Sequence, residues 1–114
     1  EMARRLEGLA EVSLESGLRG NAVSSDNPLF HTIAKVVSRT DPGAVVSPYL
    51  TPGFTNGGAY AHLGIKYMGF TPVMFPPTLE FSSLFHAADE RCPVDGFKWG
   101  VRTLYEIVSD FVGA

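Results

Sequence analysis

The sequence predicts an α/β fold in which helices pack on a small mixed or parallel sheet. Three observations support this prediction: strand-like stretches alternate with helical patterns, glycine and proline separate the two, and one long amphipathic helix closes the chain. With 114 residues, of which 45% are hydrophobic, the chain is long enough to bury one core. Size and composition therefore predict a single folded domain.

The first third of the chain predicts a strand, a linker and a helix. Residues 9–14 (LAEVSL) alternate apolar and polar side chains, and residues 17–25 contain the Gly, Asn and Ser that interrupt regular structure. Asn27 followed by Pro28 marks a helix start, because Asn caps free amides and Pro at the first helical position loses no hydrogen bond. Residues 41–43 (DPG) end this helix. Its apolar side chains have helical spacing: Phe30, Ile33, Ala34 and Val37.

The middle of the chain predicts two further strands joined by a loop and a short helix. Residues 44–50 (AVVSPYL) have the β-branched and aromatic content of a strand, with a proline that places the far end near an edge or a bend. Residues 51–58 form a glycine-bearing loop, and residues 59–63 a short helix that ends at a glycine. Residues 65–71 (IKYMGFT) are the next predicted strand.

A long helix is predicted to begin near Pro93. One face carries apolar side chains: Val94, Phe97, Val101, Leu104, Val108, Phe111 and Val112. The other side carries Asp95, Lys98, Arg102, Glu106 and Ser109. The resulting order of strand, helix, strand, short helix, strand and long helix is typical of helices covering a sheet.

Charge and hydropathy exclude several classes of partner. The net charge is −3, and Lys and Arg form no cluster that could follow a phosphate backbone, so we expect no nucleic acid. The apolar stretches at 44–50 and 65–77 are interrupted and fall short of the ~20 residues of a membrane span. Cys92, the only cysteine, is interpreted as a small apolar residue; it favours the cytoplasm but leaves the compartment open. Because the chain begins with Glu1, we expect a piece of a longer polypeptide or a processed product.

His86 is the first candidate site residue. It begins the loop that leads to the long helix, and neutral imidazole is the commonest protein ligand of zinc. A histidine with only local hydrogen bonds fits the same spacing. Asp89 and Glu90 follow it and could act as general acid–base groups, as orienting groups for His86, or as carboxylates at a helix start. His31 and His62 lack such a setting and are interpreted as structural or solvent-facing.

The loop at residues 52–58 (PGFTNGG) is the second candidate site. Its backbone amides and the Thr55 hydroxyl suit a carboxylate or phosphate at the start of the short helix. Glycines in a strand-to-helix turn also serve backbone geometry alone. The loop matches neither the Walker pattern nor GxGxxG, so a nucleotide is not indicated.

Residues 51–73 (TPGFTNGGAYAHLGIKYMGFTPV), residues 84–97 (LFHAADERCPVDGF) and the closing helix together resemble the C-terminal part of one family. It is the aminoacylase, carboxypeptidase and desuccinylase family of metallopeptidases (family M-twenty), whose members hydrolyse amide bonds with two zinc ions. The resemblance covers about residues 26–113. It implies a partial zinc-peptidase catalytic domain in residues 26–114, preceded by the end of an inserted lid or dimerisation domain (1–16) and a linker (17–25).

The resemblance also implies roles for individual residues. His86 matches the family's C-terminal zinc-binding histidine, and Asp89 and Glu90 match the acidic pair after it, which supports the ligand or the local structure. The implied cofactor is zinc, bound only in the intact enzyme, and the implied substrate is a peptide or an N-acyl amino acid. The implied substrate-contacting residues lie in the glycine-bearing loop: Gly53, Thr55 and Asn56.

The sequence departs from the family at three positions. Asn56 and Gly58 stand where the family usually has Asp and Arg, and Ala87 replaces a common Gly. The family's other zinc ligands and its Glu base lie upstream of residue 1, so we expect a fragment that is inactive alone. One alternative is a non-catalytic truncated module that self-associates through exposed strand edges and apolar surface. Another is a small-ligand binder that uses residues 52–58.

Overall fold

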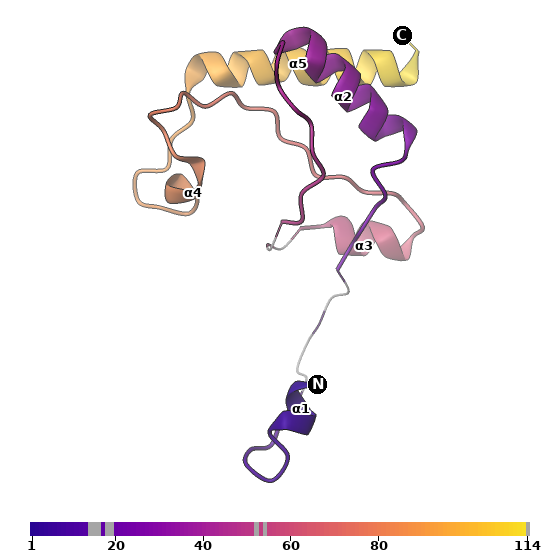
Figure 1. Cartoon of the computed structure of the whole chain (residues 1–114), viewed down its shortest axis with the longest axis vertical. Coiled ribbons are helices and arrows are strands. Elements are labelled where there is room, and N and C mark those ends of the chain that lie inside the picture. Colours follow the sequence, from indigo (N-terminus) through magenta and orange to yellow (C-terminus); the bar gives the residue numbers. More distant parts are fainter. Residues whose placement is uncertain (14–16, 18–19, 52, 54, 114) are drawn as a thin grey trace.

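The structure is a computed structural model that describes residues 1–13, 17, 20–51, 53 and 55–113. The described residues form five helices, and the two longest lie side by side while extended segments run between the others (Figure 1). The predicted first strand and linker lie partly outside the described residues. The helices are α1 (Met2–Arg5), α2 (Pro28–Thr40), α3 (Gly57–His62), α4 (Phe81–Leu84) and α5 (Val94–Val112).

Helix α2 confirms its sequence signals. The Oδ1 atom of Asn27 accepts a hydrogen bond from the Phe30 amide at 3.0 Å, and Pro28 occupies the first helical position. At the other end the Asp41 amide donates to the Val37 carbonyl at 2.8 Å, and Gly43 has a φ of 101°. The local cues therefore determine both ends of this helix.

The core lies between α2 and α5. Its buried members are Ile33, Val36 and Val37 of α2 and Ile107 of α5. Four partly buried residues pack against this cluster from α2 and from the extended segments, and join the helix pair to the rest of the chain: Leu29, Ala44, Val46 and Phe70.

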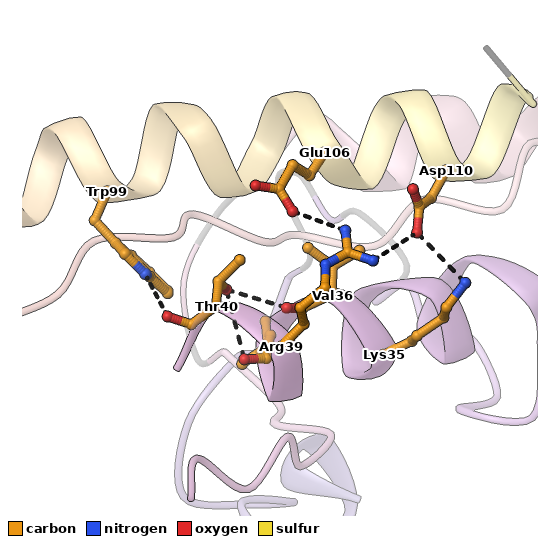
Figure 2. A network of polar contacts seen from close by, with 8 residues as sticks. Lys35, Val36, Arg39, Thr40, Trp99, Glu106 and Asp110 are labelled. Atoms are coloured by element: carbon orange, nitrogen blue, oxygen red, sulfur yellow. Dashed lines mark hydrogen bonds and ion pairs between the residues drawn. The ribbon is translucent and has the colours of Figure 1, made fainter. Parts of the chain in front are cut away.

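Polar contacts flank this core on the same pair of helices (Figure 2). Arg39 lies between two carboxylates, with Nη2 at 2.7 Å from Glu106 Oε2 and Nη1 at 3.4 Å from Asp110 Oδ2. The hydrogen bond to Glu106 is the main cause that raises the pKa of Arg39 above its usual value. The indole Nε1 of Trp99 donates to the carbonyl oxygen of Thr40 at 3.3 Å. These contacts fix the two helices in one register.

An extended segment crosses α5 at two glycines. A Cβ added to Gly100 would collide with the carbonyl oxygen of Pro72, and one added to Gly96 would collide with that of Met74. The Met74 amide also donates to the Gly96 carbonyl at 3.4 Å. The two glycines, four residues apart, thus form a flat strip on α5 against which the backbone of the extended segment packs directly.

The prediction of an α/β fold is wrong for the described residues, because they contain no strand and no sheet. Residues 44–50 and 65–71 are extended, and Ala44 and Val46 turn toward the core while Val45 faces outward. The alternation of inward-facing and outward-facing side chains that predicted strands is therefore present, but no second strand among the described residues pairs with these segments. A strand-like sequence shows that the side chains fit a half-buried extended segment. A sheet also requires a second segment whose backbone N–H and C=O groups form hydrogen bonds with the first. Residues 9–13 of the predicted first strand are irregular as well.

Helix α5 confirms the predicted long helix but buries a different face from the one that carries the large apolar side chains. The residues that meet α2 and the extended segment are small or medium-sized: Gly96, Gly100, Thr103 and Ile107. The predicted apolar face remains open, with Phe97 56% and Leu104 45% exposed.

The chain as a whole is expanded. Its radius of gyration is 18.6 Å, whereas a compact domain of this length has about 13 Å. Its accessible surface is 9404 Å², against roughly 6,100 Å² for a compact monomer of this mass. Much of the extra surface comes from large apolar side chains that a self-contained domain would bury.

Candidate functional site

His86 lies at the end of a single helical turn. Helix α4 ends on Leu84, which is buried, and the Ala87 amide donates to the Leu84 carbonyl at 3.1 Å to close the turn. His86 has a φ of 58°, the only positive φ among the described non-glycine residues. A left-handed backbone at a side-chain-bearing residue costs energy and clusters at functional sites.

The His86 ring is exposed and free to accept a ligand. Within the described part of the chain, neither ring nitrogen makes a hydrogen bond or an ion pair. The ring meets Phe85 edge-on with a centroid distance of 4.5 Å. The edge-on contact with Phe85 and the backbone conformation thus orient the imidazole, and its nitrogens remain available to bind a ligand.

His86 ends a row of aromatic side chains that the sequence prediction missed. Phe75 contacts Phe81 at a centroid distance of 5.2 Å, and Phe81 contacts Phe85 at 5.4 Å. Phe81 and Phe85 are each more than half exposed. The spacing of four residues between Phe81 and Phe85 across one helical turn was the available signal. The row gives the imidazole an apolar approach surface.

A cavity of about 570 Å³ adjoins this row. Thr71, Val73, Phe75 and Phe81 line one part of it, and Glu90, Arg91 and Cys92 complete it. Its wall is mostly apolar with one carboxylate and one guanidinium, a composition that suits a small ligand with an apolar body and a polar end.

The two predicted acidic residues take separate positions. The Asp89 carboxylate pairs with Arg91, with Oδ2 at 2.5 Å from Nη1, while Glu90 lines the cavity. In the portion of the chain that the structure describes, neither carboxylate bonds to the His86 ring. Asp89 is engaged by its neighbour, so only Glu90 is placed to face a ligand.

The glycine-bearing loop lies on a second and larger cavity. Gly53 and Thr55 line an open groove of about 940 Å³, together with side chains of both extended segments. Asn56 instead begins α3, where its carbonyl accepts the amides of Ala59 and Tyr60 at 3.0 and 3.2 Å. Residues 52 and 54 of this predicted site lie outside the described residues.

The Thr55 hydroxyl, besides lining the groove, contacts the start of α3. Its Oγ1 accepts a hydrogen bond from the Gly57 amide at 3.0 Å, so the amide predicted to hold an anion already has a partner. The ring of Tyr67 covers Gly57, with Cδ1 2.6 Å from the place of a Cβ. Tyr67 also stacks on Tyr60 at a centroid distance of 5.6 Å. Glycine here serves the close approach of an aromatic ring.

The two predicted sites share one wall but do not merge. Thr71 and Val73 line both cavities, so the extended segment runs between the loop and the aromatic row. His31 and His62 are exposed as predicted, and His31 Nε2 lies 3.2 Å from Asp26 Oδ1. His31 also meets an aromatic ring, that of Phe30, edge-on, so the feature that distinguishes His86 from the other histidines is its positive φ.

No three His, Cys, Asp or Glu side chains among the described residues lie close enough to hold an ion. Across these same residues, none of the helices is long and apolar enough to cross a membrane. Comparison of the chain with protein-family models, with curated proteins and with solved structures found no match.

Proposed function

We propose that the chain is the C-terminal part of a zinc-dependent peptidase or amidohydrolase that cleaves amide bonds of peptides or N-acyl amino acids. The observation that carries the proposal is the setting of His86: an exposed imidazole whose two nitrogens have no partner among the described residues, on a residue with a φ of 58°. Backbone strain of this kind persists where a side chain must point in one direction. A neutral imidazole that binds zinc must point one ring nitrogen at the metal, which would explain why the backbone at His86 is held in this conformation.

The proposal assigns the other ligands to protein outside the described residues. Zinc needs three or four protein ligands, and an amide hydrolase also needs a base beside the metal-bound water. In this proposal His86 fills one of the ligand positions, and the remaining ligands and the base come from other residues of the protein. The expanded shape supports the same assignment, because a radius of gyration of 18.6 Å leaves apolar surface for a further part of the protein to cover.

The residues near His86 supply binding rather than chemistry in this proposal. Phe81 and Phe85 offer an apolar surface beside the imidazole, and the cavity next to them ends in Glu90 and Arg91. A substrate with an apolar side chain matches the aromatic wall, and Arg91, which uses Nη1 to pair with Asp89, retains further N–H donors for a substrate carboxylate. N-acyl amino acids and peptide C-termini have this chemistry.

The test uses the full-length product of the gene that encodes these residues. We expect His86→Ala to lower bound zinc, measured by atomic emission, and to lower kcat/KM for N-acyl amino acids by at least ~100-fold. His62→Ala is the matched control, since His62 is also exposed but lies on α3; it should leave both quantities unchanged. Unchanged zinc content and turnover in His86→Ala would refute the assignment. Turnover by the 114-residue chain alone would refute its incompleteness.

A second candidate function is a non-catalytic module that self-associates. The exposed apolar face of α5 favours it, because Phe97, Leu104 and Phe111 each keep 45% or more of their surface open to water. In this candidate His86 is an ordinary surface residue. A full-length product without zinc and without amide hydrolysis, but with a stable oligomer, would favour the module over the enzyme.

A further inference from the structure

The exposed face of α5 has the spacing of a coiled-coil seam. Its side chains follow one another at alternating steps of three and four residues, and each is between 45% and 66% exposed. β-Branched valines occupy one set of positions, and larger side chains occupy the other. The valines are Val94, Val101 and Val108, and the larger residues are Phe97, Leu104 and Phe111. These six residues are called the α5 seam below.

Helix α2 does not obstruct the α5 seam. The residues that meet α2 and the extended segment lie about 100° around the helix axis from the seam, at 3.6 residues per turn. One flank of the seam carries Lys98, Tyr105 and Val112, with Tyr105 74% and Val112 67% exposed. The seam is therefore an open strip along the whole of α5, accessible to another helix.

We propose that the α5 seam binds the same seam of a second copy of this chain, in an antiparallel helix pair related by a two-fold axis. With the axis between Val101 and Leu104, Val101 of each copy faces Leu104 of the other. Val94 then faces Phe111 of the second copy, and Phe97 faces its Val108. All six seam residues of each copy are used, with none left over at either end. The proposal does not rest on the zinc site.

The sizes of the seam residues select this orientation. In the antiparallel register every layer combines one valine with one larger residue, so all layers have similar volume. A parallel pair would stack Val on Val and Phe on Phe, and would alternate loose with crowded layers. The helix dipoles are also opposed in the antiparallel pair.

The charges beside the seam are compatible with self-association. In the antiparallel register Lys98 lies beside Tyr105 of the second copy, where an ammonium can meet an aromatic ring. The seam itself contains no charged side chain. The pair therefore forms without burying a charge and without placing like charges opposite each other.

The area of the seam is sufficient for a reversible dimer. Covering the exposed parts of the six side chains in both copies removes about 1,100 Å² from water, taking roughly 150 to 200 Å² for each whole side chain. Specific interfaces begin at about 1,000 Å², so the contact lies at the lower end of that range. We expect a dimer whose population depends on concentration in the micromolar range.

A charge exchange across the two-fold axis tests the pairing. Val101→Glu and Leu104→Lys each place an unpaired charge in the seam, and either variant alone should weaken the dimer at least ~100-fold in sedimentation equilibrium. Mixed together, the two variants place the introduced carboxylate of one copy against the introduced ammonium of the other, and dimerisation should return. Restoration by mixing cannot come from misfolding, because both side chains are about half exposed in the single chain.

The matched control is Leu63→Lys. Leu63 is 75% exposed at the end of α3, away from the seam, and its replacement should leave the dimer unchanged. An equal loss of dimerisation in this control would show that the copies associate through apolar surface in general, and it would refute the α5 seam as the interface. A wild-type chain that stays monomeric at about 100-fold the expected dissociation constant would refute the dimer. Seam variants that fail to regain dimerisation on mixing would refute the register.

Cysteine crosslinking tests the orientation in a Cys92→Ser background, because Cys92 is exposed. Lys98→Cys and Tyr105→Cys chains should form a disulfide with each other and not with themselves. Absence of the mixed disulfide, while sedimentation equilibrium still shows a dimer, would overturn the antiparallel assignment, because in a parallel pair these two flanking positions lie on opposite sides of the interface. Circular dichroism on each variant verifies that the helices are retained.

Discussion

Gly100 of α5 lies directly against the backbone carbonyl oxygen of Pro72, with no space for a Cβ between them. The same relationship recurs one turn earlier, between Gly96 and Met74. A helix and an extended segment can approach this closely only where the helix has no side chain. This strip therefore positions the segment that forms the common wall of both cavities.

Replacing Gly100 by Ala tests the close approach. In an ordinary helix the change from Gly to Ala adds about 1 kcal/mol of stability. Here we expect the added Cβ to force the segment at Pro72 away from α5 and to lower the free energy of unfolding by about 1 to 3 kcal/mol. Urea unfolding followed by Trp99 fluorescence measures the change.

Gly69→Ala is the control for this experiment. A Cβ at Gly69 would meet nothing within 4 Å, so its effect should stay below about 0.5 kcal/mol. A stabilised Gly100→Ala variant would contradict the packing of the extended segment on α5, since only the helix propensity would then be visible.

Asn27→Ala tests the cap of α2. Asn27 is 8% exposed; its Oδ1 caps the Phe30 amide, and its Nδ2 donates to the Ser24 carbonyl and to Met68 Sδ. We expect a loss of about 1 to 2 kcal/mol in the free energy of unfolding, because the substitution leaves these groups without partners. Far-UV circular dichroism during urea unfolding measures it.

Asn56→Ala is the matched control for the cap. Asn56 occupies the same position before α3, but its side chain makes no capping hydrogen bond. Its replacement should change the free energy of unfolding by less than about 0.5 kcal/mol. Equal losses at Asn27 and Asn56 would show that the capping bond of α2 contributes nothing specific.

The sequence predicted the features that depend on neighbouring residues. The start of α2 at Pro28 follows from a cap and a proline that act within one turn, and its end follows from the Asp-Pro-Gly run at 41–43. Helix α5 follows from a period sustained over 19 residues. The exposed positions of His31 and His62 also agreed with prediction.

The features that depend on distant parts of the chain could not be predicted in the same way. Residues 44–50 and 65–71 have strand-like side chains, but nothing in a local pattern says which backbone pairs with them. On α5 the strongest apolar pattern marks the open face, whereas the buried face is built on Gly96 and Gly100. Glycines that allow another backbone segment to pack against a helix do not contribute to the pattern of apolar side chains from which a buried face is predicted.

The candidate site shows the same division. His86 was predicted from its position before the last helix, but its positive φ and its contact with Phe85 follow from the turn after α4, which the sequence did not indicate. Thr55 was predicted to contact a ligand; it lines the larger cavity, and its Oγ1 also accepts a hydrogen bond from the Gly57 amide, which the sequence did not indicate. A hydroxyl two residues before a free amide has this option as well, and only the folded backbone decides whether it is used.

Thr103→Val is expected to stabilise the α2–α5 pair. Thr103 is fully buried, and its Oγ1 has no hydrogen-bond partner among the described residues. An unpaired buried hydroxyl costs about 1 to 3 kcal/mol, and valine keeps the branched shape without the hydroxyl. We expect the free energy of unfolding to rise by about 1 kcal/mol, measured by urea unfolding with Trp99 fluorescence. Thr40→Val is the matched control, because the Thr40 hydroxyl donates to the Val36 carbonyl at 3.1 Å and its loss should give no gain. A destabilised Thr103→Val would mean that the hydroxyl has a partner in solution, such as a water molecule between the helices.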